Sequence, residues 1–349
     1  MNVVASISYT KRQQIGQGQG MNSEVFVAFD PQLSGEIVVK EVEKSKFVGL
    51  PSYFAEAQVM YRSAHDNIVP VHYACETPTH VCIAMPYFKN GSLSDRISDR
   101  SLPLTDVLAL GQGVLSGVGK IHLAGFLHFD IKPSNVLYSD TGVPMVADFG
   151  QARVVAANGL VTQAPPMYRW VRPPETFLHG VGAPQSDLFQ VGLLLYRAVN
   201  GDDFYRLQEP VIPELRAKVI AGKFPNRKLF MPHVPKRLRT VVRKALKLDP
   251  VERFQSATEF ADELARVPIV LDWRTEPLSG VGTRWTADRQ DQPSFVVDLL
   301  PDGSAWKVEI HTAWPGEKPR ARDRSVWKRG LSKDDALAHL KQVFEQLQA

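Results

Sequence analysis

The sequence has few cysteines and little excess charge of either sign. Cys75 and Cys82 are the only cysteines, and both lie in apolar, strand-like runs, where a reduced thiol behaves as a small hydrophobic side chain. We therefore expect no fold held together by disulfides. The 41 basic residues outnumber the 37 acidic ones by too few to predict a surface that coats nucleic acid, although binding of small anions stays open.

The sequence also lacks a long apolar segment. No uncharged apolar run reaches about 18 residues, the length that predicts a membrane-spanning helix. The first residues, MNVVASISYTKR, have no basic stretch followed by the continuous apolar core of a secretory signal. We therefore expect a soluble, cytoplasmic protein without a membrane partner. Its 349 residues suffice for one large domain and a smaller one.

The first part of the chain is predicted to be rich in strands. Residues 23–30 and 36–42 carry β-branched and aromatic side chains, and the turn-forming stretch PQLSG between them predicts a hairpin. Residues 51–64 have apolar side chains at helical spacing and predict a helix. Two more strand-like runs follow at 68–75 and 80–88.

After residue 90 the pattern becomes helical. Residues 104–124 and 186–199 predict buried helices, and further helical segments lie at 236–247 and 256–265. A loop-rich section, HFDIKPSNVLYSDTGVPMVADFG (128–150), joins the first two helices. A strand-rich lobe is therefore expected to precede a helical lobe.

The last part of the chain is predicted to form a separate module. The stretches PSFVVDLL and AWKVEIHTA are separated by PDGS, which predicts a hairpin, and SVWKR offers a third strand. The stretch LSKDDALAHLKQVFEQL predicts an amphipathic helix, with Ser332 and Asp335 in capping-box positions. We expect a small β-sheet with one helix at 281–349, after a linker at 267–280.

A basic run lies inside this module. Between Lys318 and Arg329, the stretch KPRARDRSVWKR carries six basic residues and one acidic residue. A surface for nucleic acid or an acidic partner is one interpretation. We favour the other, a solvated strand edge whose cations block edge pairing, and expect no nucleic-acid partner. The apolar face of the helix could close its own sheet or dock on the preceding lobe, and a regulatory partner bound through this module stays open.

Four polar residues in the loop-rich section have the chemistry for phosphoryl transfer. Asp130 could accept a proton from an attacking hydroxyl group, and Lys132 could neutralise the transferring phosphoryl group. Asn135 and Asp148 could each offer an oxygen to Mg²⁺. For any one of these residues alone, a polar turn in which it caps the local backbone is the simpler interpretation.

Upstream residues add to this pattern. In IGQGQGMNSEVF, Gly18 and Gly20 would let backbone N–H groups approach phosphate oxygens, although a glycine-rich tip is commonly only a turn. Lys40 ends the apolar strand IVVK, and Glu56 on the following helix could pair with it. A buried pair would hold the ammonium group towards the phosphates.

Taken together, the motifs HxDxKxxN and DFG and the upstream glycine, lysine and glutamate occur once each in one order. This set resembles the signature of the eukaryotic-type (Hanks-type) protein kinases, over about residues 9–266. The resemblance implies an α+β, two-lobed protein-kinase fold at 1–266. Its antiparallel, β-rich N-lobe would span about 1–88 and its α-helical C-lobe about 89–266. The module at 281–349 resembles no family that we recognise.

The resemblance also implies roles for individual residues. Asp130 would be the catalytic base, and Lys40 would contact the α and β phosphates of ATP while pairing with Glu56. The implied catalytic residues are Lys40, Glu56, Asp130 and Lys132. The implied Mg²⁺ ligands are Asn135 and Asp148. The implied nucleotide-binding residues are Gly18, Gly20, Ser23, Val25, Val38, Lys40, Met85, Pro86, Phe88 and Leu137.

Further residues match the structural positions of the family. Glu175 in RPPE is implied to pair with Arg253 in DPVERF, and Asp187 is implied to brace the backbone of the catalytic loop. Ser23 stands at the third glycine of the loop. We favour a neutral turn residue there, and a site whose phosphorylation would repel ATP is the alternative.

The sequence departs from the family pattern at two other positions. Phe129 stands where many members have the arginine that gathers a phosphorylated activation segment, so we predict activity without a phosphate on residues 151–170. Tyr168 stands where serine/threonine kinases usually have threonine. The lysine two residues after Asp130 still resembles the serine/threonine class, and tyrosine acceptance stays open.

The predicted function is that of an ATP- and Mg²⁺-dependent serine/threonine protein kinase, which we also expect to phosphorylate itself. A catalytically weak pseudokinase scaffold and a small-molecule kinase are the alternatives. The retained ionisable set argues against a scaffold, and the RPPE and DLFQVG segments favour a protein substrate. The composition suggests a bacterial signalling kinase.

Overall fold

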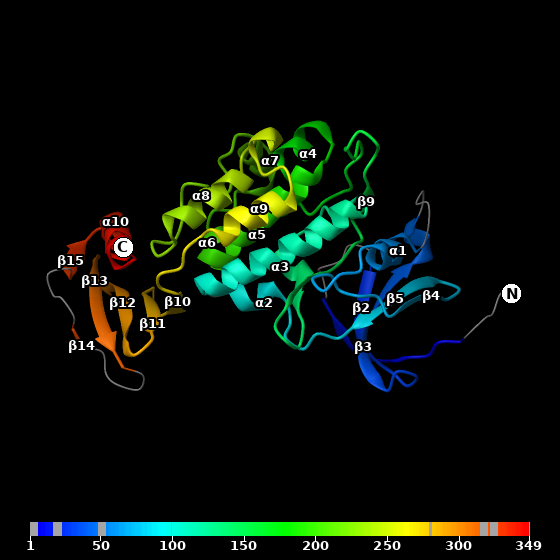
Figure 1. Ribbon diagram of the computed structural model, residues 1–349, viewed down its shortest axis with the longest axis horizontal. Helices are drawn as coiled ribbons and strands as arrows, with labels where there is room; N and C mark the ends of the chain where they lie inside the picture. The colour runs from blue at the N-terminus through cyan, green and yellow to red at the C-terminus, as the bar shows by residue number, and fades with distance from the viewer. Residues whose placement is uncertain are drawn as a thin grey trace.

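The chain folds into three parts that follow one another along the molecule (Figure 1). The computed structural model describes residues 6–16, 23–47, 54–98, 100–278, 281–314, 320–321 and 327–348. A β-rich lobe lies at one end, a helical lobe lies in the middle, and a second sheet with the helix α10 lies at the opposite end (Figure 1). Among the described residues, no helix combines the length and apolar character needed to cross a membrane.

The N-lobe is a five-stranded antiparallel sheet in the order β1-β2-β3-β5-β4, with one α-helix against it. Its elements are β1 (Thr10–Ile15), β2 (Ser23–Asp30), β3 (Gly35–Glu43), η1 (Lys44–Phe47), α1 (Ala55–Arg62), β4 (Tyr73–Glu76) and β5 (His80–Pro86). The predicted hairpin is confirmed, because β2 and β3 pair in register from Ser23 and Val42 to Asp30 and Gly35. Helix α1 lies within the predicted range 51–64, of which residues 51–53 are outside the described part.

One predicted strand is wrong at its start. The strand expected from residue 68 begins only at Tyr73. Ile68 instead bridges Val146, and the Val69 N–H donates to the Val146 carbonyl at 2.9 Å. These two apolar residues therefore join the N-lobe to the C-lobe, a tertiary pairing that local strand propensity does not reveal.

The C-lobe is built around a helix that is buried on all sides. Its elements are α2 (Leu93–Ile97), α3 (Leu104–Leu123), β6 (Phe126–Leu127), η2 (Pro133–Asn135), β7 (Val136–Tyr138), β8 (Pro144–Val146), β9 (Arg153–Val154), η3 (Arg169–Val171), α4 (Pro174–His179), α5 (Pro184–Asn200), α6 (Asp202–Arg206), α7 (Ile212–Ile220), α8 (Lys236–Ala245), η4 (Pro250–Glu252) and α9 (Ala257–Ala265). Every residue of α5 from Ser186 to Asn200 is buried, as expected of a central helix. Gly111 lets α3 approach its neighbours, since a Cβ there would lie 2.3 Å from Leu264 Cδ2.

The C-terminal sheet is larger than predicted. Its strands are β10 (Trp273–Pro277), β11 (Thr283–Arg289), β12 (Gln292–Asp302), β13 (Ala305–Ala313), β14 (Arg320–Ala321) and β15 (Lys328–Leu331), in the order β10-β11-β12-β13-β14, with β15 also paired to β13. The hairpin at PDGS is present, with Asp302 opposite Ala305. The segment 267–280 is not only a linker, because β10 lies inside it and pairs with β11. In β10, the buried residues Trp273 and Thr275 alternate with the exposed, charged residues Arg274 and Glu276. The sequence therefore has no apolar run there that would have predicted a strand.

Helix α10 (Lys333–Leu347) covers this sheet. The Ser332 hydroxyl accepts the Asp335 N–H at 3.1 Å and donates to the Asp335 carboxylate at 2.7 Å, so the predicted N-terminal cap is confirmed. The buried face of the helix consists of Ala336, Leu340, Val343 and Phe344. The module therefore closes its own sheet.

The same module also docks on the C-lobe. Trp273 and Trp285 pack on Phe344, and their ring centroids lie 4.8 and 5.5 Å, respectively, from the centroid of the Phe344 ring. This cluster is continuous with the C-lobe core. The Trp285 indole N–H donates to Nδ1 of the buried His233 at 3.0 Å. Both alternatives for the module are therefore found at once: the helix covers its own sheet, and the covered sheet packs on the C-lobe.

Candidate active site

A cavity of about 390 Å³ lies between the N-lobe sheet and the loop section of the C-lobe. Most of the predicted site residues line it: Ser23, Val25, Val38, Lys40, Glu56, Met85, Pro86, Phe88, Asn135, Leu137 and Asp148. Asp130 and Lys132 adjoin it next to Asn135. Gly18 and Gly20 lie outside the described residues. Met60, Tyr87 and Asp95 also line the cavity, and the sequence analysis did not name them.

Lys40 connects the two lobes. It lies on β3, where Val38 and Val39 are buried, and its ammonium group lies 2.7 and 2.9 Å from the two carboxylate oxygens of Glu56. The same ammonium group lies 2.7 Å from Oδ1 of Asp148. Strand β3, helix α1 and the segment after β8 thus meet at one cation. Loss of either carboxylate partner would leave a buried charge less well compensated.

The charge state of Asp148 follows from this contact. Burial alone would raise the pKa of Asp148, but the neighbouring Lys40 ammonium group outweighs it and lowers that pKa to about 2. The carboxylate is therefore ionised at neutral pH. Asp148 has a positive φ of 63°, which is uncommon for a residue other than glycine and turns the chain after β8.

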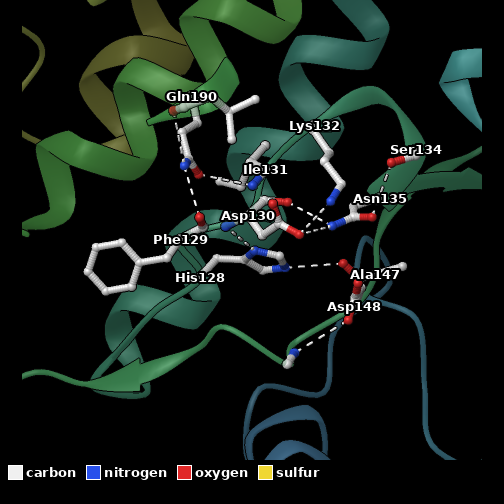
Figure 2. Close-up of polar contacts among 12 residues, drawn as sticks. His128, Phe129, Asp130, Ile131, Lys132, Ser134, Asn135, Ala147, Asp148 and Gln190 are labelled. Atoms are coloured by element: carbon white, nitrogen blue, oxygen red, sulfur yellow. Dashed lines mark hydrogen bonds and ion pairs between the residues drawn. The ribbon is translucent and has the colours of Figure 1, made fainter. Parts of the chain in front are cut away.

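Asp130 has one satisfied and one free carboxylate oxygen. Figure 2 shows Lys132 and Asn135 both pointing at this carboxylate, and their nitrogens lie 2.7 and 2.9 Å from Oδ2. The other oxygen, Oδ1, is buried without a hydrogen-bond partner. Burial raises the pKa of Asp130, while the charge of Lys132 opposes that rise. An unpartnered buried acceptor is costly, so Oδ1 is suited to accept a proton from a bound hydroxyl group.

Helix α5 holds the backbone of the loop 128–135 in place. Asp187 accepts the backbone N–H groups of His128 and Phe129, each at 2.9 Å, as the family position implied. Its carboxylate also contacts His122 Nε2 at 2.8 Å. Burial raises the pKa of Asp187, but the hydrogen bond from His122 and these further contacts lower it overall.

Gln190 is a supporting residue that the sequence analysis missed. It lies one turn after Asp187 on α5, accepts the Ile131 N–H at 2.9 Å and donates to the Phe129 carbonyl at 3.0 Å. Figure 2 shows it on the side of the loop opposite Asn135. Its spacing of three residues from Asp187 places both side chains on one helix face, and this was the only signal available in the sequence.

A second buried pair supports the C-lobe. Arg253 forms two hydrogen bonds with the Glu175 carboxylate, at 2.9 and 2.7 Å. The Ser186 hydroxyl donates to the same carboxylate at 2.7 Å. The predicted Glu175–Arg253 pair is confirmed. It ties the first turn of α4 to the residue that follows η4, and it lies outside the cavity lining.

Phe129 holds the segment 151–170 against the loop. The residue is fully buried, has a φ of 63°, and its ring points away from Asp130 (Figure 2). It packs with Leu127, Val161 and Met167 in one apolar cluster. An apolar contact therefore occupies the position at which many family members place an arginine.

The residues at the cavity fit a magnesium ion by their donor chemistry. Asn135 uses its amide nitrogen for Asp130, which leaves its carbonyl oxygen as an acceptor, and Asp148 supplies an ionised carboxylate. Oxygen donors suit Mg²⁺, which in phosphoryl-transfer sites is held by one or two carboxylates together with phosphates and water. The described part of the chain contains no group of three or more acidic, histidine or cysteine side chains that could hold a metal ion.

Comparison with known proteins agrees with this geometry. The family described as "Protein kinase domain" matches residues 9–264. The chain belongs to the protein kinase family. Among its relatives, the calcium/calmodulin-dependent protein kinase type 1B of Rattus norvegicus is 29% identical over 253 residues, which are 70% of this chain and 71% of that protein.

Two further relatives come from distant organisms. The CBL-interacting serine/threonine-protein kinase 21 of Arabidopsis thaliana is 27% identical over 218 residues, which are 61% of this chain and 52% of that protein. The serine/threonine-protein kinase PknL of Mycobacterium tuberculosis is 26% identical over 254 residues, which are 71% of this chain and 63% of that protein. The chain therefore spans about half the length of the plant kinase and under two thirds of the mycobacterial one.

Proposed function

We propose that this protein is a protein kinase that transfers the γ-phosphoryl group of ATP to serine or threonine hydroxyl groups of a protein substrate. The observation that carries this proposal is the free, buried Oδ1 of Asp130 beside Lys132, next to a cleft that holds Lys40 and Asp148. A group that accepts a proton, Asp130, and groups that neutralise phosphate charge, Lys132 and Lys40, therefore lie at one place. Phosphoryl transfer rests mainly on such positioning and electrostatic stabilisation.

Each residue has a distinct task in this proposal. Asp130 takes the proton of the attacking hydroxyl group at Oδ1, while Lys132 stabilises negative charge on the phosphoryl group. Lys40, oriented by Glu56, contacts the phosphates that stay on the nucleotide. Bound magnesium would neutralise phosphate charge, and Asn135 and Asp148 are the residues that would hold it.

The adenine would lie between the two lobes. Val25 and Val38 line the cleft from the N-lobe and Leu137 lines it from the C-lobe, so apolar side chains flank the space on both sides. Pro86 lacks a backbone N–H and leaves only a carbonyl acceptor at the end of β5, whereas Phe88 keeps its N–H. These two backbone groups suit the amino group and the ring nitrogen of adenine.

The acceptor, location and partners are also part of the proposal. The position of Lys132, two residues after the base, and the similarity to serine/threonine-protein kinases support serine and threonine acceptors, including hydroxyl groups of the chain itself. We propose a cytoplasmic signalling role in a bacterium. A regulatory protein could bind through the exposed part of the C-terminal module, and no nucleic-acid partner is proposed.

Two alternatives fit the structure less well. A pseudokinase scaffold would have no need to keep both the Lys40–Asp148 contact and the Asp130–Lys132 contact. A small-molecule kinase would not need the platform that the Glu175–Arg253 pair holds at the start of α4. A protein acceptor is therefore favoured over both.

The test is transfer of labelled phosphate from ATP by the full chain to itself and to a generic protein substrate. Asp130→Asn should lower the rate by about 10² to 10⁴-fold, because the proton acceptor is lost. Asp140→Asn, a change at an exposed carboxylate of the same section, is the matched control and should keep full activity. Equal activity of the two variants would refute the role of Asp130, and labelling of small metabolites alone would refute the protein acceptor.

A further inference from the structure

A second recess lies on the C-lobe, away from the nucleotide cleft. It has a volume of about 450 Å³ and lies between the turn after α7 and the C-terminal half of α8. Its lining consists of Gly222, Lys223, Asn226, Arg227, Lys228, Arg243 and Lys247. The lining thus contains five cationic side chains, one amide, one glycine and no carboxylate.

The charge of this recess is poorly neutralised. Lys247 lies 3.3 Å from Glu252, and this pair is exposed. Within the ranges that the structure describes, no carboxylate lies within 4 Å of the charged groups of Lys223, Lys228 or the two arginines. Four positive charges therefore surround one cavity without a paired acid from the described residues. For comparison, the whole chain carries a net charge of only +4.

The two arginines are held in place by neutral acceptors. Arg227 donates to the carbonyl oxygens of Leu246 at 2.7 Å and Gly222 at 2.9 Å. Arg243 donates to the carbonyl oxygens of Arg227 at 2.9 Å and Lys228 at 3.3 Å. These bonds fix the direction of both guanidinium groups while leaving their charge uncompensated. A freely solvated surface arginine would have no such fixed geometry.

Gly222 is required for this arrangement. Its φ is +68°, a conformation that favours glycine, and a Cβ there would lie 1.9 Å from Nη2 of Arg227. Arg227 is half-buried, and burial lowers its pKa, with the nearby charge of Arg253 adding to the effect. Arg253 has Glu175 as its counter-ion, whereas Arg227 has only carbonyl groups. A bound anion would relieve this unfavourable charge.

We propose that this recess binds a small polyanion that carries two or more phosphate groups. Arginine and lysine are the residues that recognise phosphate, and here they converge from two sides on one cavity. A volume of about 450 Å³ is large for one phosphate group, so several groups can share the cations. The lining has no apolar side chain that could recognise the side chains of a peptide, which favours a small molecule over a phosphorylated protein segment.

Occupancy of the recess would act on the C-lobe itself. The ligand would link the turn at 222–228 to α8, whose end is also held by Arg253 through the carbonyl groups of Lys247 and Leu248 at 2.8 and 2.9 Å. A ligand that binds only the folded state raises its stability. This site and its ligand are independent of whether the protein transfers phosphate to serine or threonine.

The proposal is tested with inorganic tripolyphosphate, titrated calorimetrically into the full chain at low salt without added metal. The double variant Lys223→Glu with Lys228→Glu reverses two exposed charges of the recess. The double variant Lys46→Glu with Lys341→Glu changes the net charge equally at exposed sites outside the recess and is the control. Neither pair belongs to the catalytic machinery, so kinase activity reports that each variant is folded.

We expect the wild type and the control to bind alike, and the recess variant to bind at least about tenfold more weakly. At equal concentration, the ligand should raise the melting temperature of the wild type and the control by more than that of the recess variant. Equal affinity of all three proteins, or an equal loss in both variants, would overturn the proposal. So would tighter binding of single-stranded DNA or of a doubly phosphorylated peptide with the same dependence on Lys223 and Lys228, since the occupant would then be a macromolecule.

Discussion

The ring of Phe129 fills the space that a side chain at position 182 would need. A Cβ at Gly182 would lie 2.2 Å from Cε1 of that ring. Val161 and Gly182 exchange two backbone hydrogen bonds, at 2.8 and 2.9 Å, so the segment 151–170 is fastened to the residues before α5. Packing and backbone pairing thus hold this segment.

This contact predicts activity without phosphorylation of the segment. Because Phe129 packs by apolar contact with Val161 and Met167, the segment needs no charge-assisted bond to an arginine. Thr162→Ala, and wild-type protein treated with phosphatase, should keep kinase activity within about twofold of the untreated protein. Initial rates with labelled ATP provide the measurement. Loss of activity in both samples would show that a phosphate is required.

Gly182→Ala should loosen the segment. The added methyl group would collide with the Phe129 ring, and overpacking of this kind costs about 1 to 3 kcal/mol of stability. Urea unfolding should show that loss of stability. Steady-state kinetics should show a lower turnover number and a smaller change in the KM for ATP. Adding Phe129→Leu to this variant replaces the ring by a smaller side chain, so the double variant should regain part of both the stability and the turnover number.

A matched glycine substitution controls for the backbone effect. Gly119→Ala places a Cβ at an ordinary 3.5 Å from the Ala257 Cβ, and Gly119 lies inside α3, where alanine is the better helix former. This variant should be as stable as the wild type or more so. If Gly182→Ala behaves in the same way, the contact between Phe129 and Gly182 does not hold the segment.

The pH dependence of the rate should report Asp130. Burial raises the pKa of this carboxyl group, so activity should fall on acidification at a higher pH than an exposed aspartate would give. Lys132 opposes that rise. Lys132→Met should therefore lower the rate and also move the acid limb of kcat/KM to higher pH, because the opposing charge is lost.

The comparison of pH profiles needs one further protein. Lys46→Met removes an exposed lysine of the N-lobe and should leave the acid limb where the wild type has it. Titration of ATP itself is common to all three proteins and cancels in the comparison. An unshifted limb in Lys132→Met would mean that Asp130 is not the group that titrates.

His233 should make the docked module sensitive to acid. It is fully buried without charge, and burial lowers its pKa from 6.5 to about 3. The unfolded chain therefore binds a proton below about pH 6.5 that the folded chain does not, and stability falls by about 1.4 kcal/mol per pH unit between these values. His233→Gln keeps an acceptor for the Trp285 indole N–H, so the loss between pH 7 and pH 5 should shrink by about 2 kcal/mol.

Urea unfolding followed by tryptophan fluorescence at pH 7 and pH 5 measures this difference. The exposed His179 provides the control, because His179→Gln should leave the pH dependence as in the wild type. An unchanged pH dependence in His233→Gln would place the acid sensitivity elsewhere in the molecule.

Much of the fold and the site followed from local patterns. Strands β2 and β3 were predicted from their β-branched and aromatic side chains and the turn between them, and helices α3, α5 and α10 from their long apolar or amphipathic runs. Asp130, Asn135 and Asp148 were found because their order and spacing form a motif. Strand β10 was missed, since its strand character depends on pairing with β11 and its Thr275 hydroxyl meets Ser101 across 174 residues.

The sequence by itself determined the two-lobed fold, the ionisable residues of the cleft and the capped terminal helix, because each depends on neighbouring residues or on a motif with fixed spacing. Only the tertiary structure decided which oxygen of Asp130 stays free, that Gln190 supports the loop, that Phe129 meets Gly182, and that the C-terminal sheet rests on His233. The last three of these contacts join residues far apart along the chain. Their geometry is set by how the elements pack, and the local pattern of side chains does not encode it.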